Sequence, residues 1–88
     1  GEIPTVDLPR DRLTAEPALA LTEALVLAAL ETSKGNARKT IEAGGAYVNN
    51  IKSDPAQLAR MLTEADLLFG KYILLRKGKK SYAVLRVA

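Results

Sequence analysis

The densest hydrophobic pattern lies at residues 19–30, LALTEALVLAAL, where apolar side chains occur on nearly every side of a predicted helix. Leu21, Leu25 and Ala28 follow i, i+4 and i+7 spacing along one stripe. Only two residues of this segment are polar. We therefore expect this helix to lie in the core of the protein.

A second helix is predicted over residues 34–43, shortly after the first. Ser33 is a suitable N-cap, because its hydroxyl can accept hydrogen bonds from backbone N–H groups of the first turn. Ala37 and Ile41 are one turn apart, on the side that we expect to face inward. Gly44 predicts the end of the helix, because glycine adopts the left-handed conformation without a steric penalty.

Short strands are predicted after this helix. Residues 46–48 alternate between buried and exposed types, as a strand does. The Asn49-Asn50 pair is typical of a two-residue hairpin turn, since asparagine tolerates positive φ better than most residues. Ile51 and Lys52 are expected to begin the return strand.

The rest of the chain contains one more predicted helix and the clearest hairpin. The Asp54-Pro55 pair is typical of a helix start, and residues 56–62 follow it as a short helix. Two apolar runs at residues 72–75 and 82–87 flank the polar sequence RKGKKS. This pattern predicts two antiparallel strands joined by a tight turn.

Residues 1–18 differ from the remainder. They contain three of the four prolines and no sustained helical period, so we interpret them as a linker or extended arm before a domain at residues 19–88. Ile3, Val6 and Leu8 would allow part of the arm to pair as an edge strand. The arm is typical of a connection inside a longer protein.

Composition excludes several kinds of site. The 88 residues contain no cysteine and no histidine, which excludes disulfides, thiolate zinc sites and the usual general base. Glu64 and Asp66 would diverge on a helix, so they do not indicate a catalytic carboxylate pair. We expect no catalytic residue, metal or cofactor in this chain. No apolar run approaches the roughly 20 residues that span a bilayer, so we expect a cytoplasmic protein without a membrane partner.

Charge is distributed unevenly along the chain. Residues 1–32 carry six acidic residues and two arginines, a net charge of −4, whereas residues 33–88 carry eleven basic and four acidic residues, a net charge of +7. Such asymmetry in one small domain indicates a surface that faces a polyanion.

The second helix carries the first candidate site. Lys34 stands in its first turn, where the helix dipole disfavours a cation. Free N–H groups, Lys34 and Arg38, one turn further along, could together bind a phosphate. The alternative is a solvated helix face on which Arg38 pairs with Glu42.

A second basic cluster lies at the predicted hairpin turn, in the sequence Arg76-Lys77-Gly78-Lys79-Lys80. Charge at a loop tip often serves solubility alone, but two separated clusters could straddle a nucleic-acid backbone. Tyr47, Tyr72 and Tyr82 lie in apolar or alternating runs, which favours packing. The alternative role for such a ring is stacking on an unpaired base, which we consider where the ring flanks basic residues, as Tyr47 does.

The segment SKGNARKTIEAGGAYVNN resembles the S-four type RNA-binding domain, whose alpha-L motif is shared by a small-subunit ribosomal protein, several pseudouridine synthases and bacterial tyrosyl-tRNA synthetases. The residues that stand at the positions of the motif are Ser33, Ala37, Arg38, Lys39, Ile41, Gly44, Val48 and Asn49. The sequence departs from the motif at Asn50, where the family usually has glycine.

The sequence FGKYILLRKGKKSYAVLRVA is similar to the last hairpin of bacterial tyrosyl-tRNA synthetases, and the segment around IPTVDLPRD is similar to the connection before their tRNA-binding domain. This resemblance implies a domain that grips tyrosine tRNA, chiefly by its long variable arm and neighbouring backbone. It also implies a separate catalytic domain that uses ATP and tyrosine, whose signature motifs are absent here.

Together, the pattern and the resemblance predict an α+β fold in which helices pack on a small, mostly antiparallel sheet with a C-terminal hairpin. We expect a monomer that binds tRNA. The alternatives are an accessory domain of an RNA-modifying or ribosome-associated protein, and a protein-interaction module docked through its acidic arm. The predicted RNA-binding residues line the two sides and the floor of a groove: Ser33, Lys34, Arg38, Lys39, Asn49, Lys52, Arg76, Lys77, Lys79 and Lys80.

Overall fold

Alternating burial in the two longest strands decides which face of the sheet is covered. In the computed structural model, which describes residues 2–87, Ile73 and Leu75 of β6 and Ala83 and Leu85 of β7 are fully buried. Their strand neighbours are partly exposed. Since successive side chains of a strand point to opposite faces, one face of the sheet forms the core and the other stays open.

The sheet has five strands in the order β1-β7-β6-β3-β4. Only the β1–β7 pair is parallel, and the other neighbours are antiparallel. The bounds are Thr5–Leu8 for β1, Ser81–Val87 for β7, Tyr72–Lys77 for β6, Ala46–Val48 for β3 and Ile51–Lys52 for β4. The predicted α+β fold and the predicted C-terminal hairpin are confirmed. The two strands of the hairpin extend further toward the turn than the apolar runs of the sequence do.

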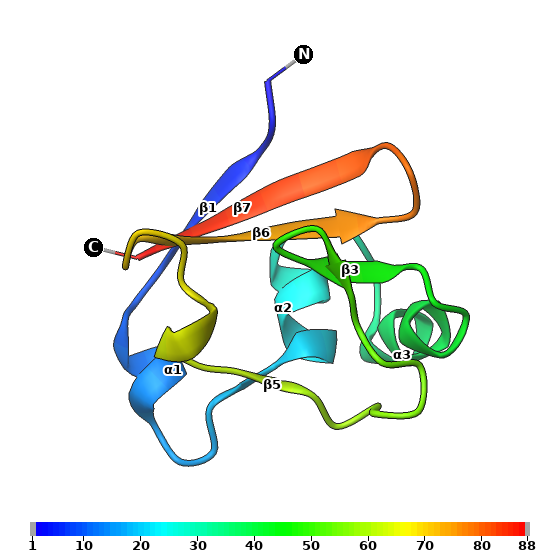
Figure 1. Ribbon diagram of the computed structural model, residues 1–88, viewed down its shortest axis with the longest axis horizontal. Helices are drawn as coiled ribbons and strands as arrows, with labels where there is room; N and C mark the ends of the chain where they lie inside the picture. The colour runs from blue at the N-terminus through cyan, green and yellow to red at the C-terminus, as the bar shows by residue number, and fades with distance from the viewer. Residues whose placement is uncertain (1, 88) are drawn as a thin grey trace.

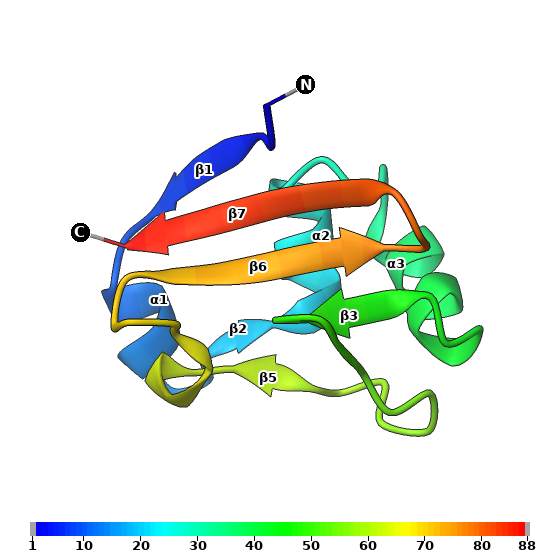
Figure 2. The ribbon, with the colours of Figure 1, turned by 45° about the horizontal axis from the view of Figure 1, so that its top comes forward.

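The three α-helices of residues 2–87 lie on the same side of this sheet (Figures 1 and 2). They are α1 (Asp11–Thr14), α2 (Leu21–Leu27) and α3 (Lys34–Glu42), and a short 3-10 helix, η1, spans Glu64–Asp66. The largest fully buried side chains come from both layers: Leu19, Leu21, Leu25, Ile41, Leu62, Ile73, Leu75 and Leu85. No helix within residues 2–87 has the length and apolar character that crossing a membrane requires.

The first helix is shorter than its hydrophobic pattern predicts. Leu19–Ala20 forms strand β2, which pairs with β5 (Met61–Leu62), so α2 begins only at Leu21. At its other end Ala29 adopts φ 60°, the Leu30 N–H donates to the Leu25 carbonyl, and the Ala29 N–H donates to the Val26 carbonyl. These bonds form a Schellman motif, in which alanine occupies the position where glycine is usual.

The prediction of a helix over residues 56–62 is wrong. Asp54 does begin a turn, since its Oδ1 accepts from the Ala56 N–H at 2.9 Å. The chain then extends into β5 instead of coiling, because Met61–Leu62 pairs with β2 and Leu62 is completely buried. Tertiary pairing overrides local propensity here.

The segment 1–18 contributes to the same core. β1 forms the predicted edge strand beside β7, and Leu8 and Leu13 are buried in the core cluster. The division into a linker at residues 1–18 and a domain at residues 19–88 stays a prediction.

Candidate nucleic-acid interface

The start of α3 is built as its sequence predicts. The Ser33 hydroxyl accepts from the Asn36 N–H at 3.1 Å, and the Asn36 side chain donates to the Thr32 hydroxyl. Lys34 is exposed in the first turn, which contains no acidic residue. The Ser33 cap therefore fixes where the first cation of the helix projects.

The basic residues of α3 do not share one face. At about 100° per residue, the buried pair Ala37 and Ile41 points inward, and Lys34 and Arg38 occupy one flank. Lys39 lies about 100° beyond Arg38, toward the outer surface. Arg38 and Glu42, both described by the structure, form no ion pair with each other, so Arg38 is available to an external anion.

The opposite flank of α3 is tied to the hairpin by a buried carboxylate. The Thr40 hydroxyl donates to Glu31 Oε2, and Lys77 Nζ lies 3.2 Å from the same oxygen. The Glu31 side chain is only 6% exposed, whereas that of Lys77 is 43% exposed. Lys77 follows Ile73 and Leu75 in the inward series of β6, so its charge compensates a buried acid.

The hairpin tip lies against the end of α3 (Figure 2). The Gly78 N–H donates to the Gly45 carbonyl at 2.8 Å, and a Cβ at Gly44 would lie 3.6 Å from Lys52 Nζ. Gly44 has positive φ, as predicted for the helix stop, and Gly78 at the hairpin tip also has positive φ. The fold thereby gathers four basic residues around the Gly44–Gly45 turn, which we call the basic corner: Lys39, Lys52, Lys79 and Lys80.

Ser33 and Lys34 lie at the other end of α3, about 13 Å along the helix from this turn. The predicted groove residues on α3 are therefore spread over the length of the helix.

Asn49 is used within the fold. It and Asn50 have φ 53° and 65°, which confirms the predicted turn. The Asn49 Oδ1 accepts from the Leu74 N–H at 2.9 Å, and its Nδ2 donates to the Asp66 carbonyl at 2.7 Å. Both polar groups of the side chain thus hold the turn against β6 and η1.

Arg76 lies in the sheet and not at the hairpin tip, which corrects the predicted extent of the turn. Cross-strand pairing places it between Tyr47 and Tyr82 on the open face. Its guanidinium carbon lies 3.8 Å from the Tyr47 ring centroid and 5.8 Å from that of Tyr82. The pairing of Arg76 with Tyr82 was predictable, because the two residues are equally far from the Gly78 turn of the hairpin. Its pairing with Tyr47 was not, because no local feature of the sequence brings the two strands together.

Four arginines elsewhere in the structure have carboxylate partners. Arg10, Arg12, Arg60 and Arg86 pair with acids at 2.5–3.0 Å. Two of these carboxylates, Glu23 and Asp7, come from residues 1–32, and Asp7 belongs to the acidic arm at residues 1–18, so part of the charge of the arm is neutralised within the fold. Eight cations have no ion-pair partner among residues 2–87: Lys34, Arg38, Lys39, Lys52, Lys71, Arg76, Lys79 and Lys80.

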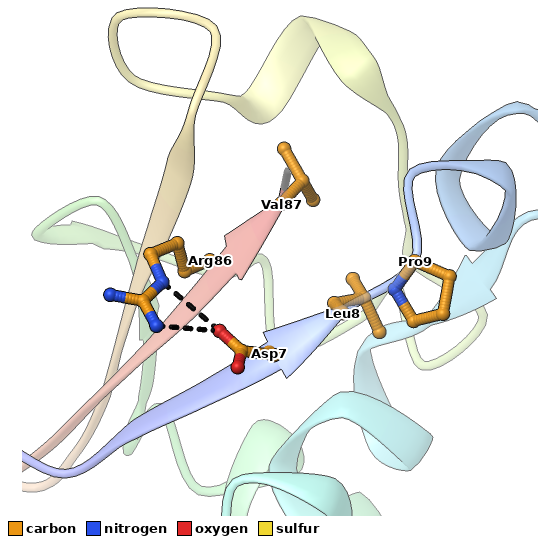
Figure 3. A pocket seen from close by; sticks show the side chains of 5 residues that line it. All are labelled: Asp7, Leu8, Pro9, Arg86 and Val87. Atoms are coloured by element: carbon orange, nitrogen blue, oxygen red, sulfur yellow. Dashed lines mark hydrogen bonds and ion pairs between the residues drawn. The ribbon is translucent and has the colours of Figure 1, made fainter.

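A pocket lies at the opposite end of β7 from the hairpin tip. Leu8, Pro9 and Val87 line it, and the Asp7–Arg86 ion pair, at 2.8 Å, borders it (Figure 3). Among residues 2–87, the only charged residues that line this pocket are Asp7 and Arg86, which neutralise each other, so the pocket is not part of the basic surface.

Comparison with known proteins decides the family. The model of the family described as "Tyrosine--tRNA ligase SYY-like C-terminal domain" matches residues 2–85. The chain belongs to this family. The match begins before β1, so β1 and α1 lie within the matched region of the tyrosine--tRNA ligase C-terminal domain, together with α3 and most of the hairpin.

Individual tyrosine--tRNA ligases match over nearly the whole chain. The protein of Opitutus terrae is 51% identical over 87 residues, covering 99% of this chain and 20% of the relative. The relative in Roseiflexus castenholzii is 41% identical over 86 residues, with 98% and 20% covered. That of Rhodopirellula baltica is 38% identical over 87 residues, with 99% and 19% covered. The chain thus spans about a fifth of these relatives, and its resemblance to bacterial tyrosyl-tRNA synthetases is confirmed.

Proposed function

We propose that this domain binds tRNA, and that within a tyrosine--tRNA ligase it grips the long variable arm and neighbouring backbone of tyrosine tRNA. A separate catalytic domain would then attach tyrosine to the held tRNA. The observation that carries the proposal is the distribution of cations. Of the eight without an ion-pair partner among residues 2–87, seven lie on α3, β4, β6 and the β6–β7 turn.

An external polyanion accounts for this distribution. Clustered like charges repel one another, so a fold gains nothing from leaving them together without counter-charges. Phosphate groups supply those charges, and folded RNA presents them with 2′-hydroxyls across a wide, shallow groove. Lys34 and Arg38 would contact one stretch of backbone, and the basic corner another.

The other predicted contact residues support this surface from within. Ser33 caps α3, Asn49 holds the β3–β4 turn, and Lys77 links the hairpin to α3 through Glu31. Their predicted contacts with RNA would be secondary to these roles.

The names of the relatives support the wider setting of the proposal. As a tyrosine--tRNA ligase domain, the chain would act in the cytoplasm beside a catalytic domain that binds ATP and tyrosine. It would need no cofactor of its own, and we expect the 88-residue chain to be monomeric.

Fluorescence anisotropy tests the proposal. The chain is titrated against tyrosine tRNA and against the same tRNA with a shortened variable arm, between 50 and 200 mM salt. About four to six phosphate contacts would give a log–log salt slope of roughly −3 to −5. Weak binding to both RNAs with no salt dependence would contradict the proposal.

The double variant Lys34→Ala with Arg38→Ala locates the site on α3. Loss of two phosphate contacts should lower the magnitude of the slope by roughly 1.5 to 2. Lys71→Ala is the matched control, because Lys71 is also an exposed cation without an ion-pair partner among residues 2–87 but precedes β6 at the opposite end from the hairpin tip. A slope unchanged in the double variant would remove α3 from the site.

A further inference from the structure

The open face of the sheet carries a row of four side chains, two of which, the tyrosines, are not among the predicted groove residues. Cross-strand pairing aligns Lys52 with Tyr47, Tyr47 with Arg76, and Arg76 with Tyr82. Directly paired residues project from the same face of a sheet. The described helices lie over the other face (Figures 1 and 2), so none of them covers this row.

Arg76 is held in position but has no acceptor. Its guanidinium stacks on Tyr47 at 3.8 Å, well inside the roughly 6 Å limit of a cation–π contact. Its Nε is buried without a hydrogen-bond partner, and no residue of the described range 2–87 accepts from its other nitrogens. A planar guanidinium oriented by an aromatic ring matches a phosphate with two parallel hydrogen bonds.

Tyr82 offers a different surface. Its ring centroid is 5.8 Å from the Arg76 guanidinium carbon, close to the limit of a cation–π contact, so Arg76 engages it less than Tyr47. Tyr82 is also partly exposed. An aromatic ring beside a phosphate-binding arginine is suited to stacking on a nucleobase.

The charge of the open face indicates which kind of molecule binds it. The row contains two cations and no acid, and Lys52 also belongs to the basic corner, which makes the two surfaces continuous. The carboxylate of Asp7 lies at the other end of β7 and is paired with Arg86. A polyanion with flat aromatic groups therefore fits better than a protein surface.

We propose that this row binds one unpaired nucleotide of the RNA, with Arg76 and Lys52 on its phosphate and Tyr82 on its base. The proposal rests on the proposed tRNA-binding function and extends it from α3 to the open face of the sheet. An RNA strand that passes the basic corner would place a base flipped out of its stack on Tyr82.

Three variants test the nucleotide site by anisotropy with tyrosine tRNA. Tyr82→Leu removes the ring and should weaken binding about 5- to 150-fold, the cost of one base–aromatic stack. The salt slope should stay unchanged, because no phosphate contact is lost. Tyr82→Phe keeps the ring and should bind within about twofold of the wild type. Tyr72→Leu should also bind normally, because Tyr72 occupies the same face at the far end of β6.

A photochemical measurement on the unaltered protein removes any dependence on the folding of the variants. Tyrosine tRNA that carries 5-iodouridine in its unpaired regions should crosslink to the peptide containing Tyr82 and not to that containing Tyr72. Wild-type binding by Tyr82→Leu, or crosslinks to other peptides only, would overturn the nucleotide site while leaving the tRNA-binding function intact. Absence of salt-dependent tRNA binding by the wild type would instead overturn both.

Discussion

Replacing Lys77 with alanine separates a structural cation from the RNA-binding ones. The change removes the partner that lies 3.2 Å from Glu31 Oε2, leaving a carboxylate that is 6% exposed with the Thr40 hydroxyl as its remaining donor. Breaking a fully buried ion pair costs about 3–5 kcal/mol. The Lys77 side chain is 43% exposed, so water screens this pair, and we expect a loss of about 1–3 kcal/mol.

Thermal and urea unfolding, followed by circular dichroism, measure this loss. For a domain of this size, each kcal/mol should lower Tm by about 4–8 °C. The salt slope of tRNA binding should hardly change, because the charge of Lys77 is already compensated. Lys79→Ala should do the reverse: an unchanged Tm, and a slope smaller in magnitude by roughly 0.7–0.9.

A double-mutant cycle identifies the cause. In a Glu31→Gln background no buried charge needs compensation, so Lys77→Ala should then cost less than about 0.5 kcal/mol. The reasoning is refuted if Lys77→Ala keeps the wild-type Tm and lowers the salt slope as Lys79→Ala does. An undiminished cost in the Glu31→Gln background would refute the assigned partner.

Two further changes test the turns of the fold. Ala29→Gly should stabilise the protein by about 0.5–1 kcal/mol in urea unfolding, because a left-handed L-residue costs about 1–2 kcal/mol, partly offset by the greater freedom of glycine in the unfolded chain. A lower midpoint would contradict the assigned Schellman motif. Asn49→Ala should lower stability by about 1–3 kcal/mol, because the Leu74 N–H and the Asp66 carbonyl lose their partners. The same variant should keep the wild-type affinity for tRNA, and a lower affinity with an unchanged salt slope would instead identify Asn49 as an RNA contact.

Several features of this protein were predictable from the sequence because they depend on neighbouring residues. The Ser33 cap, the Gly44 stop, the Asn49-Asn50 turn and the turn at Gly78 all depend on the conformational preferences of one or two residues. The motif that begins at Ser33 indicated an S-four type RNA-binding domain, and the last hairpin together with the segment around IPTVDLPRD indicated the tyrosyl-tRNA synthetases.

Contacts between distant segments were not predictable in this way. The β2–β5 pairing shortened one predicted helix and replaced another, because burying Leu62 against Leu19 outweighs the helical propensity of residues 56–62.

The roles of the hairpin cations were decided by the same kind of contact. The sequence places Arg76 and Lys77 side by side, and strand geometry sends them to opposite faces. Arg76 stacks on Tyr47 on the open face, while Lys77 turns inward to Glu31. Local sequence thus determined where the turns and cations occur. Only tertiary structure decided which cations are neutralised and which stay available, because ion-pair and ring partners are brought together by strand pairing and packing.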